Sequence, residues 1–339
     1  LKVTLPEKGR IALSNCGFWG MNIEKGKGYY LRMNTSNGNR FEGRAILKLV
    51  AEDGTELCNR PLAIDPDRTW CEYTGQLTAT GSDPHARFVI ELEGTGTLLL
   101  DYVSLFPETF RNRINGLRKD IAQTLEALHP AFVRWPGGCI VEGIDLSNRI
   151  EWKKTIGDPK NRPGIYDTWG YRATMGFGYH EFLQFCEDIR AAGMFVCNAG
   201  IGCQGRVGDA CREEDLDAFI QDALDAIDYA LGDGTTEWSR KRVENGHPEP
   251  FPLQYVEIGN ENWGPVYEKR YDRFYRAIKA KYPRLTLIST LGLGGQRRHE
   301  RVDMIDPHWY VAPEFFLSSS RLFDQQERGG YAVYVGEYA

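Results

Sequence analysis

A change of sequence period after residue 108 constrains the fold more than any other feature of this chain. From there to residue 339, short apolar runs alternate with amphipathic helical segments. The runs are continuously apolar, which is typical of parallel strands covered by helices. The expected strands are residues 131–135, 194–201, 253–260, 285–290, 304–310 and 331–337, and the expected helices are 115–130, 178–193, 213–232 and 268–283.

Two architectures satisfy this alternation, a doubly wound sheet and a closed (β/α)8 barrel. No glycine-rich phosphate fingerprint opens a helix after an expected strand, which weakens the dinucleotide-binding form of the doubly wound sheet. The longest expected loop, residues 139–178, follows the carboxyl end of a strand. A barrel carries its active-site loops at that end of its strands.

Residues 1–108 have the pattern of an all-β domain. Four segments, 28–36, 44–54, 86–94 and 96–106, have strand composition and are separated by Gly, Asn, Asp and Ser. This spacing predicts a β-sandwich or jelly roll, and no helix of normal length fits. We therefore expect two domains, residues 1–108 and 109–339.

Composition excludes several classes of partner. The net charge is −6 and the pI about 5.7, so no basic field favours nucleic acid, and the basic stretches 109–120 and 294–301 are interpreted as solvated faces. No apolar run approaches the length of a membrane span. The eight cysteines form no C-x-x-C pair, which argues against a structural metal; their even number is compatible with disulfides, but their scattered, apolar-flanked positions favour buried thiols.

Polar side chains stand at the carboxyl ends of five expected strands. They are Arg134, Asn198, Asn260 with Glu261, His308 with Tyr310, and Glu337. Gly259 to Asn262 taken alone is also ordinary turn chemistry. Because parallel strands bring their carboxyl ends together, the five ends jointly predict a pocket.

Glu261 and Glu337 are the paired carboxylates that glycoside hydrolysis requires. We expect Glu261 to be the acid/base, because Asn260 before it can bind a ring hydroxyl. Arg134 could keep Glu337 ionised, although a structural ion pair explains Arg134 equally well, and a solvated terminus would explain Glu337. A separation of about 5 Å would make the second carboxylate a nucleophile, and roughly 6.5–9.5 Å a base for water.

Several motifs occur in an order that resembles the α-L-arabinofuranosidases of glycoside hydrolase family 51, in the branch with a sandwich like a carbohydrate-binding module. They are NCGFWGM, LDYVSLFPETF, RWPGGCIVEG, GFGYHEFLQFCEDI, YVEIGNENWG, DPHWY and VGEYA. The resemblance implies a (β/α)8 barrel with the acid/base after strand four and the nucleophile after strand seven. Here the two glutamates follow the third and sixth expected strands. We therefore expect a fragment, an incomplete barrel of strands 2–7 preceded by the sandwich.

The resemblance also implies roles for individual residues. It makes Glu261 the acid/base, Glu337 the nucleophile and Asn260 the binder of the 2-hydroxyl. Arg134, His308 and Tyr310 match positions around the nucleophile, Trp169 resembles a loop tryptophan that covers the sugar, and Cys139 stands where many members have Asn. The family's glutamate from the first strand cannot be assigned. The implied reaction is retaining removal of terminal α-L-arabinofuranosyl units from arabinan or arabinoxylan, without cofactor or metal.

Two rival functions stay open. One is another retaining activity on this scaffold, such as a β-xylosidase or endoglucanase. The other is a non-catalytic carbohydrate-binding protein that uses sandwich aromatics; Phe18, Trp19 and Trp70 are the candidates, and we expect them to pack in the core. The compartment (periplasmic, extracellular or cytoplasmic) and any oligomer are not readable from the sequence. The 339-residue chain by itself is expected to be inactive and prone to aggregate.

Overall fold

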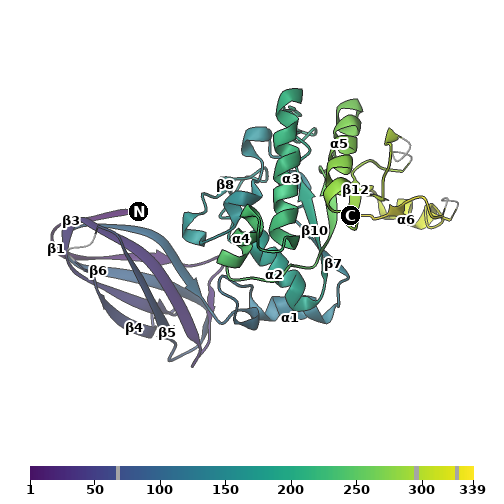
Figure 1. Cartoon of the computed structure of the whole chain (residues 1–339). Helices are drawn as coiled ribbons and strands as arrows, with labels where there is room; N and C mark the ends of the chain where they lie inside the picture. The colour runs from purple at the N-terminus through teal and green to yellow at the C-terminus, as the bar shows by residue number, and fades with distance from the viewer. Residues whose placement is uncertain (66–68, 294–297, 325–327) are drawn as a thin grey trace. The chain divides into compact units, whose positions relative to one another are not determined.

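The chain divides into two compact units, Leu1–Gln123 and Thr124–Ala339 (Figure 1). The structure is a computed structural model that describes residues 1–65, 69–293, 298–324 and 328–339. Of the basic stretch 294–301, residues 294–297 lie outside the described residues. The predicted domain boundary at residue 108 follows the last strand of the first unit.

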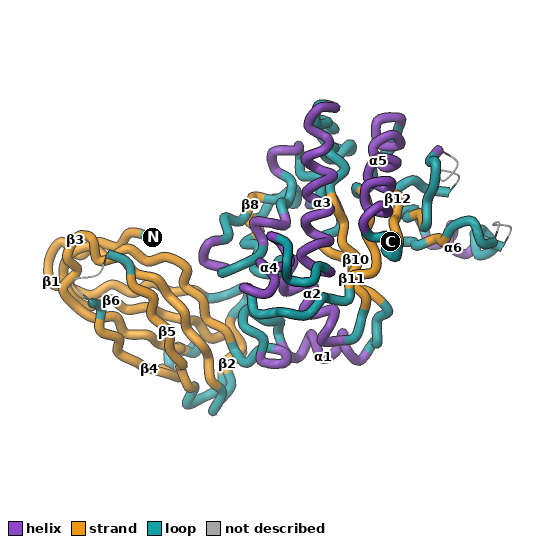
Figure 2. Tube along the Cα trace, in the orientation of Figure 1, coloured by secondary structure: helices purple, strands orange, loops and turns teal. Residues whose placement is uncertain are grey.

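The first unit is an antiparallel β-structure, as the sequence predicts (Figure 2). Its sheet has the order β1-β6-β3-β4, with β2 paired to β6 and β5 paired to β3. The bounds are β1 Lys2–Asn15, β2 Met21–Ile23, β3 Gly28–Val50, β4 Glu56–Ala63, β5 Cys71–Thr78 and β6 Asp83–Phe106. A buried apolar cluster that includes Leu31, Leu47, Phe88 and Leu98 forms its core.

Two long strands, β3 and β6, replace the four short strands that the sequence predicts. The glycines that separate the predicted segments lie inside these strands, where the backbones of β3 and β6 pass very close to each other. A Cβ on Gly43 would lie 2.1 Å from the carbonyl oxygen of Glu93, and one on Gly94 would lie 2.2 Å from that of Glu42. The pairing register shifts between Ser36 and Glu42, so the strands bend without ending.

The sandwich aromatics do not pack in the core, so that expectation is wrong. Phe18 is 84% exposed, Trp19 85% and Trp70 55%. The rings of Phe18 and Trp19 stack on each other, with centroids 4.9 Å apart. Trp19 lies in a turn and has a φ of 62°.

The second unit contains a parallel sheet whose strands lie side by side in chain order. The order is β7-β10-β11-β12-β13-β14, and each described pair is parallel. A doubly wound sheet would reverse direction from its first strand, so this order identifies part of a (β/α)8 barrel. The bounds are β7 Phe132–Trp135, β10 Ala192–Cys197, β11 Leu253–Ile258, β12 Thr286–Ser289, β13 Met304–Ile305 and β14 Ala332–Val333.

Helices connect and cover these strands. Their bounds are α1 Lys119–Ala127, α2 Tyr179–Ile189, α3 Leu216–Leu231, α4 Glu237–Glu244, α5 Pro265–Lys281 and α6 Pro313–Ser318. The apolar faces of α2, α3 and α5 pack with the strands in one cluster that includes Phe182, Ile227 and Phe274. The sequence did not predict α4, which is short and largely polar and begins with a capping box at Thr236.

The predicted loop 139–178 contains short local structure. It includes the hairpin β8 Ile165–Tyr166 with β9 Arg172–Ala173. Short 3-10 helices occur here and elsewhere in the chain, at η1 Phe110–Asn112, η2 Gly138–Ile140, η3 Leu146–Asn148, η4 Trp152–Thr155, η5 Pro159–Asn161 and η6 Glu213–Asp215.

Two further observations concern the chain as a whole. None of the described helices has both the length and the apolar character needed to cross a membrane. All eight cysteines lie in the described residues and are free thiols. Cys186, Cys197 and Cys203 are buried, whereas Cys16 is exposed, which the sequence did not predict.

Candidate active site

The carboxyl ends of the parallel strands bring six of the predicted site residues into one network. Arg134 comes from β7, Asn260 and Glu261 follow β11, His308 and Tyr310 follow β13, and Glu337 follows β14. The chain separation between these residues reaches 203 positions. The parallel sheet is the reason why they meet.

Arg134 lies at the centre of this network. Its Nε and Nη2 donate to the two carboxylate oxygens of Glu257, at 2.7 and 3.1 Å. Nη1 donates to Oε1 of Glu337 at 2.8 Å, and Nη2 also donates to Oδ1 of Asn260 at 2.8 Å. Burial lowers the pKa of Arg134, but the carboxylates of Glu257 and Glu337 raise it above its ordinary value, so the guanidinium stays charged.

Glu337 is held as an anion. Besides Arg134, its Oε2 accepts a hydrogen bond from the Tyr310 hydroxyl at 2.7 Å and lies 3.6 Å from Nδ1 of His308. Burial raises the pKa of Glu337, but the Tyr310 hydrogen bond and the charges of His308 and Arg134 lower it below its ordinary value. The same contact raises the pKa of Tyr310 to about 12.

Glu261 lies in a tight turn directly after β11. Gly259 has a φ of 82° and Glu261 a φ of 47°, so the turn that the Gly259 to Asn262 stretch suggests is present. It coexists with the site, because the turn directs Glu261 toward His308. Oε1 of Glu261 lies 2.9 Å from Nδ1 of His308. The side chain of Glu261 is 38% exposed, against 18% for Glu337.

His308 lies between three carboxylates, those of Glu261, Glu337 and Asp306. Its Nε2 lies 3.1 Å from Oδ2 of the buried Asp306. Burial lowers the pKa of His308, but the hydrogen bonds to Asp306 and Glu261 and the charge of Glu337 raise it to about 10. Single oxygens of Glu261 and Glu337 and a ring nitrogen of His308 all lie within 4.8 Å of one another.

Sequence reasoning missed four buried residues of this site: Glu142, Glu257, Asn262 and Asp306. Nδ2 of Asn260 donates to Oε2 of Glu142 at 3.2 Å, and Nδ2 of Asn262 donates to Oε1 at 2.7 Å. Burial and the charge of Glu261 raise the pKa of Glu142 to about 8, against the opposing effect of both amides. Glu142 lies inside the RWPGGCIVEG motif, so its position there was the available signal.

A cavity of about 640 Å³ opens beside this network. Glu261, His308 and Cys139 line it, together with Trp263 and Arg206. Trp169 is not among the lining residues; its exposed ring lies under the Arg206 guanidinium, 5.6 Å from the ring centroid. Asn198 has a structural position, because its Nδ2 donates to the carbonyl oxygens of Val141 and Ile201.

Three groups of side chains in the described residues have the spacing of metal ligands. They are Cys139–Glu142–Cys203, Glu257–Asp306–His308 and Glu261–His308–Glu337. The second and third include side chains that already pair with Arg134 or with one another through hydrogen bonds. The first group has no such ion pair with a basic side chain among the described contacts.

Comparisons with known proteins agree on one family. Residues 124–328 match the family model described as Alpha-L-arabinofuranosidase 1 domain. An extracellular exo-alpha-L-arabinofuranosidase of Streptomyces chartreusis is 36% identical over 97% of this chain and 42% of its own length. Alpha-L-arabinofuranosidase 1 of Arabidopsis thaliana is also 36% identical, over 98% of this chain and 48% of its own length.

A solved structure extends the comparison to the whole fold. The arabinose-bound MgGH51 α-L-arabinofuranosidase matches with a TM-score of 0.92 and 31% identity, over 100% of this chain and 56% of that one. The chain thus spans about half the length of the proteins that it resembles. Because the family model matches more than half of the chain and the fold agrees throughout, the chain belongs to the α-L-arabinofuranosidases of glycoside hydrolase family 51.

Proposed function

We propose that the complete protein is a retaining α-L-arabinofuranosidase that removes terminal arabinofuranosyl units from arabinan- or arabinoxylan-type glycans. The observation that carries the proposal is the meeting of Glu261 and Glu337 from two separate strands. One oxygen of each lies within 4.8 Å of the other. A retaining mechanism requires carboxyl groups about 5 Å apart, whereas an inverting one requires roughly 6.5–9.5 Å.

Glu337 is the nucleophile in this proposal. A nucleophilic carboxylate must be ionised before the sugar binds, and Arg134 and Tyr310 both stabilise its anion. The hydrogen bond from Tyr310 occupies Oε2, and the one from Arg134 occupies Oε1. Both contacts fix the orientation of the carboxylate toward the site.

Glu261 is the acid/base. It is more exposed than Glu337 and lines the cavity, where a leaving group would exit. We assign the Nε2 proton of His308 to the hydrogen bond with Asp306, so that a second proton lies between Nδ1 and Oε1 of Glu261. That shared proton is available to the glycosidic oxygen.

The reaction then proceeds in two balanced steps. In the first, a carboxylate oxygen of Glu337 bonds to the anomeric carbon while the glycosidic C–O bond breaks, and Glu261 gives its proton to the leaving oxygen. In the second, Glu261 takes a proton from water as the water oxygen bonds to the anomeric carbon. The ester bond to Glu337 breaks, and both carboxyl groups return to their starting states.

The sugar contacts remain part of the proposal. Asn260 is fully buried and its Oδ1 accepts from Arg134, so its second Nδ2 hydrogen is the group left for the 2-hydroxyl. Cys139 lines the cavity at the position where many family members have Asn. The indole face of Trp169 contacts the guanidinium of Arg206, a cavity residue, and this contact supports a position for Trp169 beside the bound sugar.

The test is hydrolysis of 4-nitrophenyl α-L-arabinofuranoside by the complete gene product. Glu337→Ala should lower kcat by at least about 10⁴-fold. Added azide should restore cleavage by Glu337→Ala and give an arabinofuranosyl azide of inverted anomeric configuration. Added azide should also restore cleavage by Glu261→Ala, but there the azide product should have the retained configuration. Glu244→Ala, which changes an exposed glutamate of α4, is the matched control and should stay fully active.

Other outcomes would overturn parts of the proposal. Cleavage of a 4-nitrophenyl xyloside or glucoside instead of the arabinofuranoside would leave the two-glutamate mechanism and remove the arabinose assignment. A folded protein that binds glycans and cleaves none would make it a carbohydrate-binding protein. Rescue of Glu337→Ala with retained configuration would exchange the two glutamate roles.

A further inference from the structure

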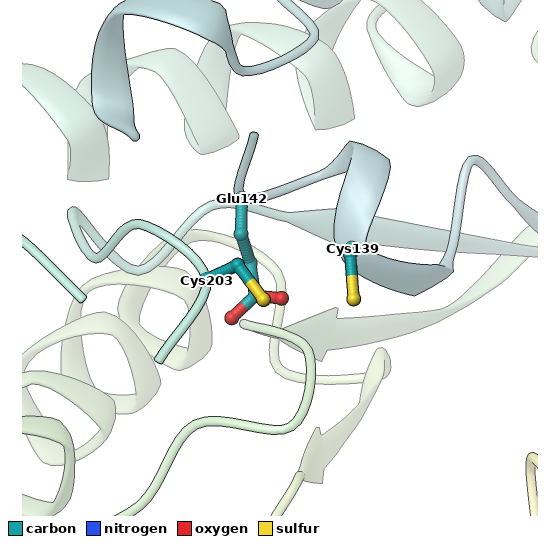
Figure 3. A group of neighbouring side chains, drawn as sticks. All are labelled: Cys139, Glu142 and Cys203. Atoms are coloured by element: carbon teal, nitrogen blue, oxygen red, sulfur yellow. The ribbon is translucent and has the colours of Figure 1, made fainter. Parts of the chain in front are cut away.

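Cys139, Glu142 and Cys203 form a cluster beside Glu261, and none of the three takes part in the proposed bond-breaking steps, although Cys139 is a proposed sugar contact. One sulfur of each cysteine and one carboxylate oxygen of Glu142 all lie within 4.8 Å of one another. Figure 3 shows Cys139 on the short helix η2, Glu142 just after that helix and Cys203 on a separate loop. Cys203 is 5% exposed and Glu142 1%, so these two side chains are shielded from solvent, whereas Cys139 is half-buried.

The backbone holds the two loops together. The amide of Gly143 donates to the carbonyl oxygen of Cys139 at 2.8 Å, and the amide of Cys203 donates to that of Gly143 at 3.4 Å. Asn198, at the end of β10, donates to the carbonyl oxygen of Val141 at 2.9 Å. The ligand positions are therefore set by the fold before any ligand binds.

The carboxylate of Glu142 is oriented by two amides. Asn260 donates to its Oε2 and Asn262 to its Oε1. Each oxygen accepts one of these amide bonds, and the Cys203 thiol is a further hydrogen-bond partner of the carboxylate, so a cation bound by both groups would take the place of the thiol proton. Outer hydrogen bonds of this kind are what fixes the direction of a carboxylate that binds a metal.

We propose that Cys139, Cys203 and Glu142 bind a thiophilic divalent cation, with Zn²⁺ as the best match. Two sulfurs and one oxygen are a ligand set that Zn²⁺ prefers over the hard cations Mg²⁺ and Ca²⁺. Ligand atoms around tetrahedral zinc lie roughly 3.5 Å apart. The three ligand atoms here lie within 4.8 Å of one another, so small side-chain rotations would bring them to that distance. Both cysteines line the cavity, which gives the ion a path of entry and leaves its fourth position to water.

A cation bound by Cys139, Cys203 and Glu142 would affect the sugar site. Cys139 and Glu261 line the same cavity, so a bound ion with its water takes space that a sugar needs and adds positive charge near the acid/base. Bound Zn²⁺ therefore inhibits hydrolysis. This consequence rests on the proposed function, whereas binding of the ion does not.

The test measures binding and activity separately on the complete gene product, reduced and stripped of metal. Cd²⁺ is the probe, because cadmium–thiolate bonds have an ultraviolet charge-transfer band. One equivalent of Cd²⁺ should give that band, and added Zn²⁺ should displace the Cd²⁺ and remove the band. Cys139→Ser and Cys203→Ser should each weaken Cd²⁺ binding at least about 100-fold, and Glu142→Gln at least about 10-fold.

Cys16→Ser is the matched control, since Cys16 is an exposed thiol outside this cluster. It should bind Cd²⁺ as the parent does, and circular dichroism should show that every variant is folded. Zn²⁺ should inhibit 4-nitrophenyl α-L-arabinofuranoside hydrolysis in the parent and in Cys16→Ser, while Cys203→Ser should resist it. If Cd²⁺ binds but no variant cleaves arabinofuranosides, the metal site stands and the proposed function falls.

Three results would overturn the metal site. They are the absence of the thiolate band at equimolar Cd²⁺, a band that persists in both serine variants, and a Cys139–Cys203 disulfide that reforms in air in the presence of Zn²⁺. The last result would identify a redox pair instead.

Discussion

At the scale of single residues, Arg134 satisfies two carboxylates whose surroundings differ. Glu257 is fully buried, so water does not screen its charge, and the guanidinium binds both of its oxygens. Glu337 is partly exposed and takes only one N–H from Arg134. The buried pair with Glu257 fixes the arginine, and the fixed arginine then holds the proposed nucleophile.

Replacement of Arg134 therefore tests stability as well as activity. Arg134→Met should lower the free energy of unfolding by about 3–5 kcal/mol, because Glu257 is left buried without a counter-ion. Adding Glu257→Gln should restore part of that loss. Urea unfolding of the parent, the two single variants and the double variant measures the coupling. Purely additive effects would show that the ion pair does not carry the stability.

Replacement of Tyr310 tests how the ionisation of Glu337 is maintained. The pKa of Glu337 is lowered, so hydrolysis should be lost only as the pH falls through that low value. Tyr310→Phe removes a hydrogen bond to the anion, which raises the pKa and moves the acid limb of kcat/KM to higher pH. Because Tyr310 is largely exposed, we expect a shift of up to about one pH unit.

The matched control is Tyr338→Phe, whose exposed ring lies against Phe316. Its pH profile should coincide with that of the parent. An unchanged acid limb in Tyr310→Phe would mean that Arg134 and His308 alone set the ionisation of Glu337.

The sequence indicated the exposed members of the network better than the buried ones. Asp306, His308 and Tyr310 stand at alternate positions of the expected strand 304–310, but the pattern singles out only the last two, and the observed β13 ends at Ile305. Glu257 interrupts an apolar strand, which is itself a signal of a buried ion pair. Its partner was not identifiable, because Arg134 lies 123 residues away.

At the scale of elements, the close pairing of β3 with β6 at Gly43 and Gly94 depends on glycine. Gly94→Ala should lower the free energy of unfolding by at least about 2 kcal/mol, because the new Cβ would lie 2.2 Å from the carbonyl oxygen of Glu42. Gly54→Ala is the control, since Gly54 also has a positive φ but has no atom within 4 Å of the new Cβ. Gly54→Ala should lower the free energy of unfolding by only about 1 kcal/mol.

Chemical unfolding followed by tryptophan fluorescence measures both variants. Equal losses would contradict the close approach of the strands and attribute the effect to backbone conformation alone.

Local sequence identified most elements but not their continuity. Glycine marks both turns and close approaches of paired strands, so the pattern predicts a strand end between residues 36 and 44, although β3 continues through this segment. The short polar helix α4 lacks an apolar stripe, and periodicity does not detect it. The exposure of Phe18 and Trp19 depends on a turn with positive φ, which composition does not reveal.

At the scale of the whole molecule, the parallel sheet has open edges. Among the described strands, β7 pairs only with β10, and β14 only with β13. We predict that the 339-residue chain expressed alone aggregates and lacks activity, since unpaired edges recruit other strands. Size-exclusion chromatography with light scattering tests this, with the complete gene product as the control. A monodisperse, cooperatively melting 339-residue chain would contradict it.

The contact between Arg134 and Glu337 also determines when the candidate site can assemble during synthesis of the chain. The two residues are 203 positions apart in the chain and 2.8 Å apart in space. A ribosome releases the amino-terminal elements first, and they begin to fold before the later strands emerge. The proposed nucleophile therefore meets its counter-ion only after β14 has docked, so this part of the candidate site cannot form on the nascent chain before Glu337 has emerged.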